Sequence, residues 1–257
     1  MSIESLKQKA KNIRQRIVRM IGEAKTSHVG GALSAADILT ALYFEVMSIN
    51  PKKPDWQKRD RFILSKGHAA AALYATLAER GFFPPETLKT FLANGSSLTG
   101  HPSFQCVPGV EASTGSLGHG LSIGIGMALG SRYDGLKNSI YVLISDGECD
   151  EGSVWEGVLF AGCHALDNLT VIIDYNKIQS FGRTKEVLDI EPLKEKFKAF
   201  RWDVEEIQGH DLKEIVQALR KTKTKKGKPR CIIAHTVKGK GVSFMENKLE
   251  WHYFNPS

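Results

Sequence analysis

The chain has 257 residues, 42% of them hydrophobic, and carries a net charge of +7. This length fits one large α/β domain or two small ones, and the apolar content supports a substantial core. No long uncharged apolar segment and no signal-peptide pattern is present, and the four cysteines have no CxxC spacing, so we expect a cytoplasmic protein without a membrane span.

Segments with helical periodicity alternate with short apolar runs along the chain. Helices are predicted, in chain order, over residues 3–22, about 35–47, 70–79, 84–93, 121–133, about 153–166, 191–199 and 211–220. Strands are predicted over residues 61–64, 140–144, 169–173, 201–207 and 231–236. This alternation favours an α/β fold, with a parallel central sheet covered by helices on both faces. No linker or repeat interrupts the chain, so we expect a single domain over residues 1–257 with an extended C-terminal arm from about residue 236.

Two helix starts are predicted from capping residues. Residues 26–31 are rich in glycine and predict a loop, after which Ser34 would cap the helix that begins near Ala35. Ser153 would cap the helix that follows the strand at 140–144. The apolar side of that helix is predicted to consist of Val154, Val158, Leu159, Ala161 and Leu166.

The segment from Tyr141 to Ser180 organises the chain. Its two predicted strands end at Asp146 and at Asn176, so both side chains lie just past the carboxyl end of a strand within one βαβ unit. Open α/β sheets bind ligands at that edge. A single Asp-Gly is more often only a turn, but the acidic stretch at 148–151 is unexpected beside a phosphate site unless a cation is present. One carboxylate and one amide oxygen suit Mg²⁺, which leaves room for phosphate.

Three histidines, His28, His68 and His101, lie in loops that contain or adjoin glycine. A lone histidine is more often structural, but three in such loops favour a role in binding or proton transfer. Neither an HExxH nor a GxSxG motif is present, which argues against a zinc site and a hydrolase triad. Gly118-His119-Gly120 could open a dinucleotide-binding helix, but no strong strand precedes it and Asp134 is a poor ribose partner.

Eight lysines and arginines fall between Lys221 and Lys240. Nucleic-acid binding is one interpretation of such a run. No interleaved aromatic residues or nucleic-acid motif accompany it, so we expect no nucleic-acid partner. A solvated helix end and loop is favoured, with Lys238 and Lys240 as the residues closest to a phosphate.

These motifs resemble the transketolase family. SDGECDEG, followed by NLTVIIDYNKIQ, is similar to the thiamine diphosphate fingerprint Gly-Asp-Gly and a later Asn, with Ser145 in place of the first Gly. The loops around His28, His68 and His101 resemble the family's Ser-Gly-His-x-Gly, Gly-His-Ala and Gly-His-Pro loops, with Ser27 in place of Gly in the first. Residues 114–120 resemble the Thr-Gly-Pro-Leu-Gly-Gln-Gly loop, with Ser116 and His119 in place of Pro and Gln.

The resemblance implies an active site. Asp146, Asn176 and the carbonyl of Ile178 would hold Mg²⁺, for which Ca²⁺ or Mn²⁺ could substitute. The residues implied to contact thiamine diphosphate are His68, Gly115, Leu117, Asp146, Gly147, Glu148, Glu151, Asn176 and Ile178. Glu151 also matches a family glutamate at the subunit contact. The histidines implied to bind substrate hydroxyls and move protons are His28, His68, His101 and His252.

The resemblance covers essentially the whole chain but only the first part of a full-length transketolase. It therefore implies the N-terminal subunit of a split transketolase, whose partner chain carries the pyrimidine-binding domain, most simply in an α₂β₂ assembly. The implied reaction moves a two-carbon ketol unit from a ketose phosphate to an aldose phosphate, as in the pentose phosphate pathway. Three alternatives stay open: a specialised transferase with a different acceptor, a split 2-oxoacid dehydrogenase E1-type subunit, and a module that binds the cofactor without turnover.

Overall fold

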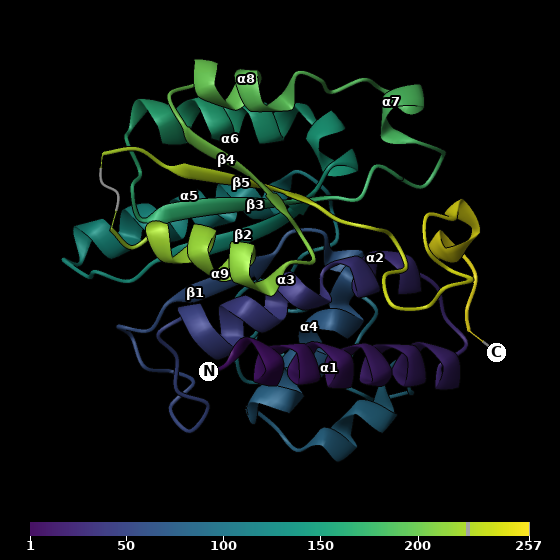
Figure 1. Cartoon of the computed structure of the whole chain (residues 1–257). Helices are drawn as coiled ribbons and strands as arrows, with labels where there is room; N and C mark the ends of the chain where they lie inside the picture. The colour runs from purple at the N-terminus through teal and green to yellow at the C-terminus, as the bar shows by residue number, and fades with distance from the viewer. Residues whose placement is uncertain (225–226, 257) are drawn as a thin grey trace.

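Five parallel strands form one central sheet in the order β1-β2-β3-β5-β4 (Figure 1). The computed structural model describes residues 1–224 and 227–256, so Lys225 and Lys226 of the basic run lie outside the described residues. The strands are β1 (Arg61–Leu64), β2 (Ile140–Ser145), β3 (Leu169–Tyr175), β4 (Asp203–Gln208) and β5 (Arg230–His235). The prediction of a parallel α/β sheet is confirmed, and each strand lies within two residues of its predicted place.

Side chains of the strands alternate between two apolar cores, one on each face of the sheet. In β1, Phe62 and Leu64 belong to one core and Ile63 to the other. In β2, Tyr141 and Leu143 face the first core, whereas Ile140, Val142 and Ile144 face the second. Because the strands are buried on both faces, they appear in the sequence as continuous apolar runs.

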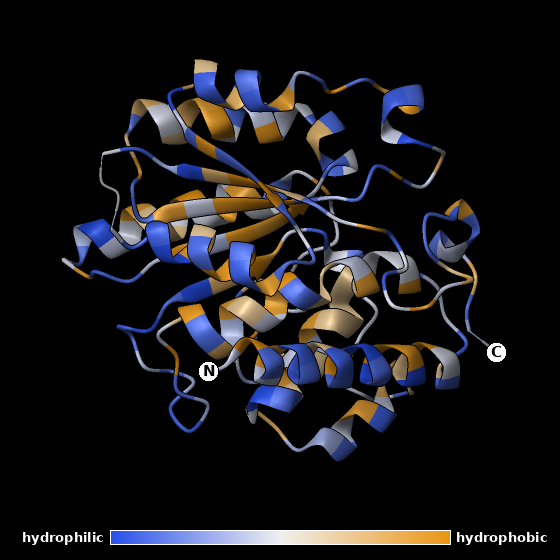
Figure 2. Ribbon diagram, in the orientation of Figure 1, coloured by the Kyte–Doolittle hydropathy of each residue, from blue (hydrophilic) through white to orange (hydrophobic). Residues whose placement is uncertain are grey.

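Helices cover both faces of the sheet. The first core is covered by α1 (Ile3–Glu23), α2 (Val29–Ser34), α3 (Ala36–Ala41), the π-helical turn η1 (Leu42–Val46), α4 (Ala70–Arg80) and α9 (Leu212–Lys221). The second is covered by α5 (His119–Tyr133), α6 (Gly152–Cys163) and α8 (Leu193–Ala199). Short turns complete the order: η2 (Gly67–Ala69), η3 (Pro85–Thr90), η4 (Gly147–Asp150), α7 (Thr184–Val187) and η5 (Leu249–His252). Figure 2 shows hydrophobic residues on the central strands and hydrophilic ones along the outward faces of α1 and α9.

Among the described residues, no helix combines the length and apolarity needed to span a bilayer.

The prediction of a loop over residues 26–31 is wrong for its second half, because α2 already begins at Val29. A Cβ on Gly30 would lie 3.0 Å from the side chain of Lys238, and one on Gly31 would lie 3.5 Å from the ring of His68. The distance at Gly30 is shorter than an ordinary van der Waals contact and favours a small residue, and tertiary packing here outweighs the low helix propensity of glycine. Ser34 consequently lies at the end of α2 and does not cap the next helix.

The start of α6 also differs from the prediction. The helix begins at Gly152, and the Ser153 hydroxyl donates to the carbonyl of Gly118 at 3.2 Å instead of capping the helix. Leu159 was wrongly placed on the buried side, since it is 55% exposed. Val154 and Val158 are fully buried, and a helical residue one position further along points about 100° away from them.

The chain after β5 forms an arm that lies beside α2 (Figure 1). The amide of Gly239 donates to the carbonyl of Gly30 at 3.0 Å, and the amide of His28 donates to the carbonyl of His252 at 3.0 Å. The arm contains η5, which was not predicted because a single 3₁₀ turn has no sequence periodicity. These contacts bring His252 back to the first predicted histidine loop.

Candidate active site

The carboxyl ends of β1, β2, β3 and β5 meet at one edge of the sheet, where a cavity of about 180 Å³ opens. Ten of the predicted site residues line it: His28, His68, His101, His252, Gly115, Leu117, Asp146, Gly147, Asn176 and Ile178. A larger groove lies between α1, α9 and the residues around Gly241, but none of the predicted residues lines that groove. Ten residues predicted from separate motifs therefore share one cavity.

Asp146 follows β2 and is only 1% exposed. Its carboxylate accepts hydrogen bonds from the amide of Gly147 at 2.9 Å, the amide of Lys177, and the hydroxyl of Thr184 at 3.2 Å. Burial and the nearby charge of Asp174 raise the pKa of Asp146 to about 6. Within the described residues, no lysine or arginine forms an ion pair with it, so a bound cation would stabilise its charged form.

Asn176 and Ile178 lie in the turn that follows β3. The Asn176 side-chain oxygen accepts from the amide of Ile178 at 3.2 Å, and Lys177 between them has a positive φ of 69°. A carboxylate, an amide and a carbonyl oxygen are hard ligands that suit Mg²⁺, Mn²⁺ or Ca²⁺. Across the described ranges, no three histidine, cysteine or acidic side chains cluster as a metal site. The chemistry of these three donors thus fits a divalent cation.

Four histidines from separate parts of the chain surround the cavity. The ring centroid of His28 lies 5.4 Å from that of His68, 6.4 Å from that of His101 and 5.0 Å from that of His252. Burial is the main cause that lowers the pKa of His28, His68 and His252, and the ammonium groups of nearby lysines lower it further. The pKa of His252 falls to about 3. These three rings are therefore neutral at neutral pH, and each offers one N–H donor and one acceptor.

Lys238 fixes the hydrogen-bonding role of His252. Its ammonium donates to Nδ1 of His252 at 2.9 Å and to the carbonyl of Ile178 at 2.9 Å. The hydrogen of the neutral His252 ring must then be on Nε2. His28 Nδ1 is buried and has no hydrogen-bond partner among the described residues, and His28 also adopts a positive φ of 73°. A free polar atom and an unfavourable backbone conformation are features that concentrate at ligand sites.

Glycines allow two loops to meet below His101. A Cβ on Gly67 would lie 2.7 Å from the amide nitrogen of Gly115, and a Cβ on Gly115 would lie 3.0 Å from the His101 ring. Gly115 also has a φ of 152°, which other residues rarely adopt. The loop that presents Leu117 to the cavity therefore packs directly on two of the histidine loops.

Glu148 and Glu151 do not line the cavity. Glu148 is fully buried and accepts hydrogen bonds from the Ser65 hydroxyl, from the amide of Gly118 at 2.9 Å and from the amide of Ser145 at 3.2 Å. It therefore joins the 115–120 loop to the ends of β1 and β2. Glu151 is exposed at the start of α6, next to Gly118.

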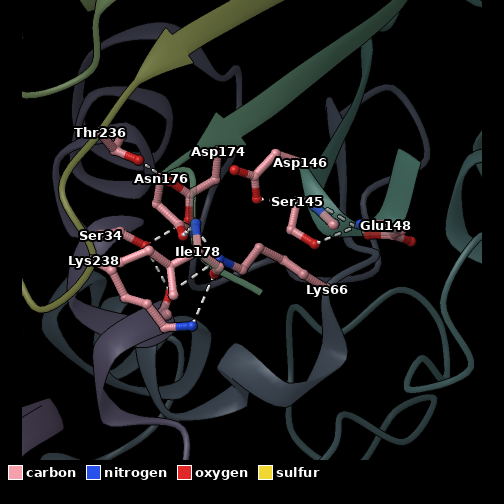
Figure 3. Close-up of polar contacts among 12 residues, drawn as sticks. Ser34, Lys66, Ser145, Asp146, Glu148, Asp174, Asn176, Ile178, Thr236 and Lys238 are labelled. Carbon is pink, nitrogen blue, oxygen red and sulfur yellow. Dashed lines mark hydrogen bonds and ion pairs between the residues drawn. The ribbon is translucent and has the colours of Figure 1, made fainter. Parts of the chain in front are cut away.

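Several residues of the site were missed by the sequence analysis. Lys66 and Asp174 form a fully buried ion pair beneath the cavity (Figure 3). Both positions carried a signal, since each is a charge at the end of an apolar run. Of the two lysines expected near a phosphate, Lys238 lines the cavity, whereas Lys240 forms an ion pair with Glu246 at the surface.

The fold and the site together define an α/β domain with a polar cavity at the carboxyl edge of a parallel sheet, where such sheets bind ligands. Residues 5–254 match the family described as transketolase, thiamine diphosphate binding domain. The chain belongs to the transketolase family, of which it forms this cofactor-binding domain. The resemblance expected from the motifs is thus confirmed, in preference to a 2-oxoacid dehydrogenase E1-type chain.

Similar proteins of nearly the same length are named as subunits of transketolases. The chain is 44% identical over 257 residues to an apulose-4-phosphate transketolase subunit of Phocaeicola vulgatus, and the match covers 100% of this chain and 91% of that protein. It is 47% identical over 247 residues to the 6-deoxy-6-sulfo-D-fructose transketolase subunit SqwG of Clostridium sp. strain MSTE9, with 96% and 90% covered. These relatives are enzyme subunits, as the sequence analysis expected.

Solved transketolases share the fold but are much longer. The transketolase of Campylobacter jejuni superimposes with a TM-score of 0.93 at 35% identity, and the match covers 99% of this chain but 41% of that one. The transketolase of Leishmania mexicana gives a TM-score of 0.92 at 32% identity, with 97% and 39% covered. The chain therefore spans about two fifths of the length of these transketolases.

Proposed function

We propose that this chain holds Mg²⁺ and thiamine diphosphate in the cavity described above and supplies half of the active site of a two-chain transketolase. The observation that carries the proposal is the convergence of Asp146, Asn176, the Ile178 carbonyl and four histidines on one cavity. Apart from Asn176 and Ile178, these residues lie at least 30 positions from one another in the sequence. Their meeting at the carboxyl edge of the sheet supports a shared ligand.

Different residues of the chain would contact the cation and the cofactor. Asp146, Asn176 and the carbonyl of Ile178 would hold the cation, and the cation would hold the diphosphate. Lys238 now donates to the same Ile178 carbonyl, so it lies where it can also contact a phosphate oxygen. Gly115 and Leu117 would pack against the cofactor. When bound, thiamine diphosphate supplies a carbanion that breaks the carbon–carbon bond next to a ketose carbonyl.

The histidines would bind sugar hydroxyls and move protons. His252, with its hydrogen on Nε2, would donate to a substrate oxygen, and the free Nδ1 of His28 offers a further contact. His68 is half-buried, whereas His101 is exposed at the margin of the cavity, where an incoming sugar would meet it first. The neutral rings of His28, His68 and His252 suit the binding of hydroxyl groups, because each offers one N–H donor and one acceptor.

A partner chain would complete the site. Relatives of the same length are named as subunits, which supports a second chain carrying the pyrimidine-binding domain. Phe181, Leu188 and Tyr253 are more than half exposed on the segments that flank the cavity, and such residues are typical of a protein interface. We propose an α₂β₂ assembly in which the exposed Glu151 contacts another subunit. The four free cysteines are consistent with a cytoplasmic location.

The substrates would be a ketose phosphate donor and an aldose phosphate acceptor, as in the pentose phosphate pathway. A specialised donor is the second candidate, because two relatives are named for apulose 4-phosphate and 6-deoxy-6-sulfo-D-fructose. These two names differ in the anionic group of the sugar, a phosphate in one and a sulfonate in the other.

Ketol transfer by the chain together with its partner tests the proposal. Xylulose 5-phosphate, apulose 4-phosphate and 6-deoxy-6-sulfo-D-fructose would be offered as donors, with thiamine diphosphate, Mg²⁺ and an aldose phosphate acceptor. Transfer that needs both chains and the cofactor supports the proposal. The preferred donor then decides between an ordinary ketose phosphate and a specialised donor. Transfer by this chain alone would contradict the half-site arrangement, and no transfer from any donor by an assembled complex would contradict the reaction.

A further inference from the structure

A fully buried carboxylate lies beneath the proposed cofactor site. Asp174 and Lys66 are both 0% exposed and form an ion pair. Three side chains donate to this one carboxylate: Lys66 and Ser34 to Oδ2, the latter at 2.6 Å, and Thr236 to Oδ1 (Figure 3). Lys66 also donates to the carbonyl of Gly31 at 3.0 Å. The name "Asp174 cluster" is used below for Asp174, Lys66, Ser34 and Thr236.

Each member of the Asp174 cluster comes from a different segment of the site. Lys66 lies two positions before His68, and Thr236 lies two positions before Lys238. Ser34 ends α2, the short helix that begins directly after His28. The cluster therefore ties three segments that line the cavity to β3, which carries the Asp174 carboxylate.

The backbone of Asp174 is joined to the proposed metal ligands as well. Its carbonyl accepts from the amide of Asn176 at 3.1 Å and from the amide of Asp146 at 3.4 Å. Any displacement of Asp174 would consequently be passed to both ligands. The Asp174 side chain thus holds the segments that carry His28, His68 and Lys238. Its main chain holds the segments that carry the proposed cation ligands Asp146 and Asn176.

The cluster is costly for a purely structural role. The Asp174 carboxylate and the Lys66 ammonium are both 0% exposed, so both charged groups are removed from water. A buried ion pair gives little net stability, because desolvation of both charges offsets their attraction, and a well-packed apolar pair often serves as well. Its place at the junction of four site segments points to a requirement for precise geometry.

We propose that Asp174 is a positioning residue, and that its bonds to Lys66, Ser34 and Thr236 fix the relative placement of the histidine loops and the cation ligands. This inference rests on the proposed function, since the affinity it controls is that for Mg²⁺ and thiamine diphosphate. Outer residues that orient ligands typically change affinity or activity by about 10- to 100-fold when they are removed.

Thr236→Val is the most informative change. Removing Lys66 or Asp174 alone would leave a buried charge unpaired and destabilise the fold. Valine instead matches the shape of threonine and removes only the bond to Oδ1. Thr236→Ser keeps a hydroxyl and tests for rescue. Thr76→Val is the matched control, because Thr76 is 0% exposed and its hydroxyl donates only to the carbonyl of Ala72 in α4.

Isothermal titration of thiamine diphosphate with Mg²⁺ into the two-chain complex gives the affinity, and thermal unfolding of each variant gives its stability. We expect Thr236→Val to weaken binding about tenfold, Thr236→Ser to return it close to wild type, and Thr76→Val to leave it unchanged. Equal affinity for wild type and Thr236→Val, or equal losses for Thr236→Val and Thr76→Val, would overturn the inference alone. Failure of the wild-type complex to bind thiamine diphosphate would instead overturn the proposed function, and this inference with it.

Discussion

Asp146→Asn is expected to stabilise the metal-free chain at neutral pH while abolishing the binding of Mg²⁺ and thiamine diphosphate. The carboxylate is 1% exposed, and burial, followed by the charge of Asp174, raises its pKa from 3.8 to about 6. An acid whose pKa is raised by folding favours the folded state at low pH. That contribution is lost as the pH rises through about 6, because the unfolded chain releases its proton first.

The size of this change in stability follows from the difference between the two pKa values of Asp146, 3.8 and about 6. At about 1.4 kcal/mol for each pH unit, the ionised carboxylate costs the folded chain about 3 kcal/mol at neutral pH. Asparagine cannot ionise, but its amide nitrogen cannot accept a hydrogen bond. One of the two backbone bonds now made by Gly147 and Lys177 is then lost, at a cost of about 1 kcal/mol. The expected gain in the free energy of unfolding is therefore about 2 kcal/mol.

Urea unfolding with a chelator present, measured over a range of pH, tests this arithmetic. The variant should be the more stable protein at neutral pH and the less stable one near pH 4, where the buried carboxyl group of the wild type is protonated. Asp211→Asn is a suitable control, because Asp211 caps α9 away from the cavity and asparagine caps helices equally well. A variant that is less stable than wild type at neutral pH, or a difference that does not change with pH, would refute the reasoning.

The remaining predictions concern packing, the cavity and the arm. Gly162→Ala should lower the free energy of unfolding by about 3 kcal/mol, because the new Cβ would lie 1.8 Å from the carbonyl oxygen of Phe200. In Gly126→Ala the new Cβ meets no atom within 4 Å, so this change should raise the free energy of unfolding by about 0.5–1 kcal/mol. Similar free energies of urea unfolding for Gly162→Ala and Gly126→Ala would be inconsistent with this packing. His101→Ala should lower kcat far more than cofactor affinity, and the reverse pattern in steady-state kinetics and titration would assign it to the cofactor. Lys238→Met should loosen the arm and speed its cleavage by protease relative to Lys240→Met, and equal rates would argue that Lys238 does not hold the arm in place.

The central unit of the fold could be predicted because its signals are local. The apolar runs of β2 and β3 end directly at Asp146 and Asn176, and parallel strands place their carboxyl ends at one edge. The histidines were found by their glycine neighbours, and the motifs of a known family placed His252 although no local pattern did. Residue type and spacing were sufficient at these positions.

Other parts of the molecule depend on contacts between distant segments. The Lys66–Asp174 pair joins positions 108 residues apart, and neither residue alone indicates its partner. The start of α2 at Val29 depends on packing against the arm and His68, which outweighs the local effect of its glycines. Leu159 was misplaced because apolar residues occur all round α6, so the sequence does not distinguish its buried side from its exposed one.

Titration of thiamine diphosphate into the two-chain complex, with and without Mg²⁺, tests the account most directly when wild type and Asp146→Asn are compared. The account predicts tight binding by wild type only when Mg²⁺, Mn²⁺ or Ca²⁺ is present, and no cation-dependent binding by Asp146→Asn although it remains folded. Equal, cation-dependent binding by the two proteins would show that the cofactor is held elsewhere and would contradict the assignment of the site.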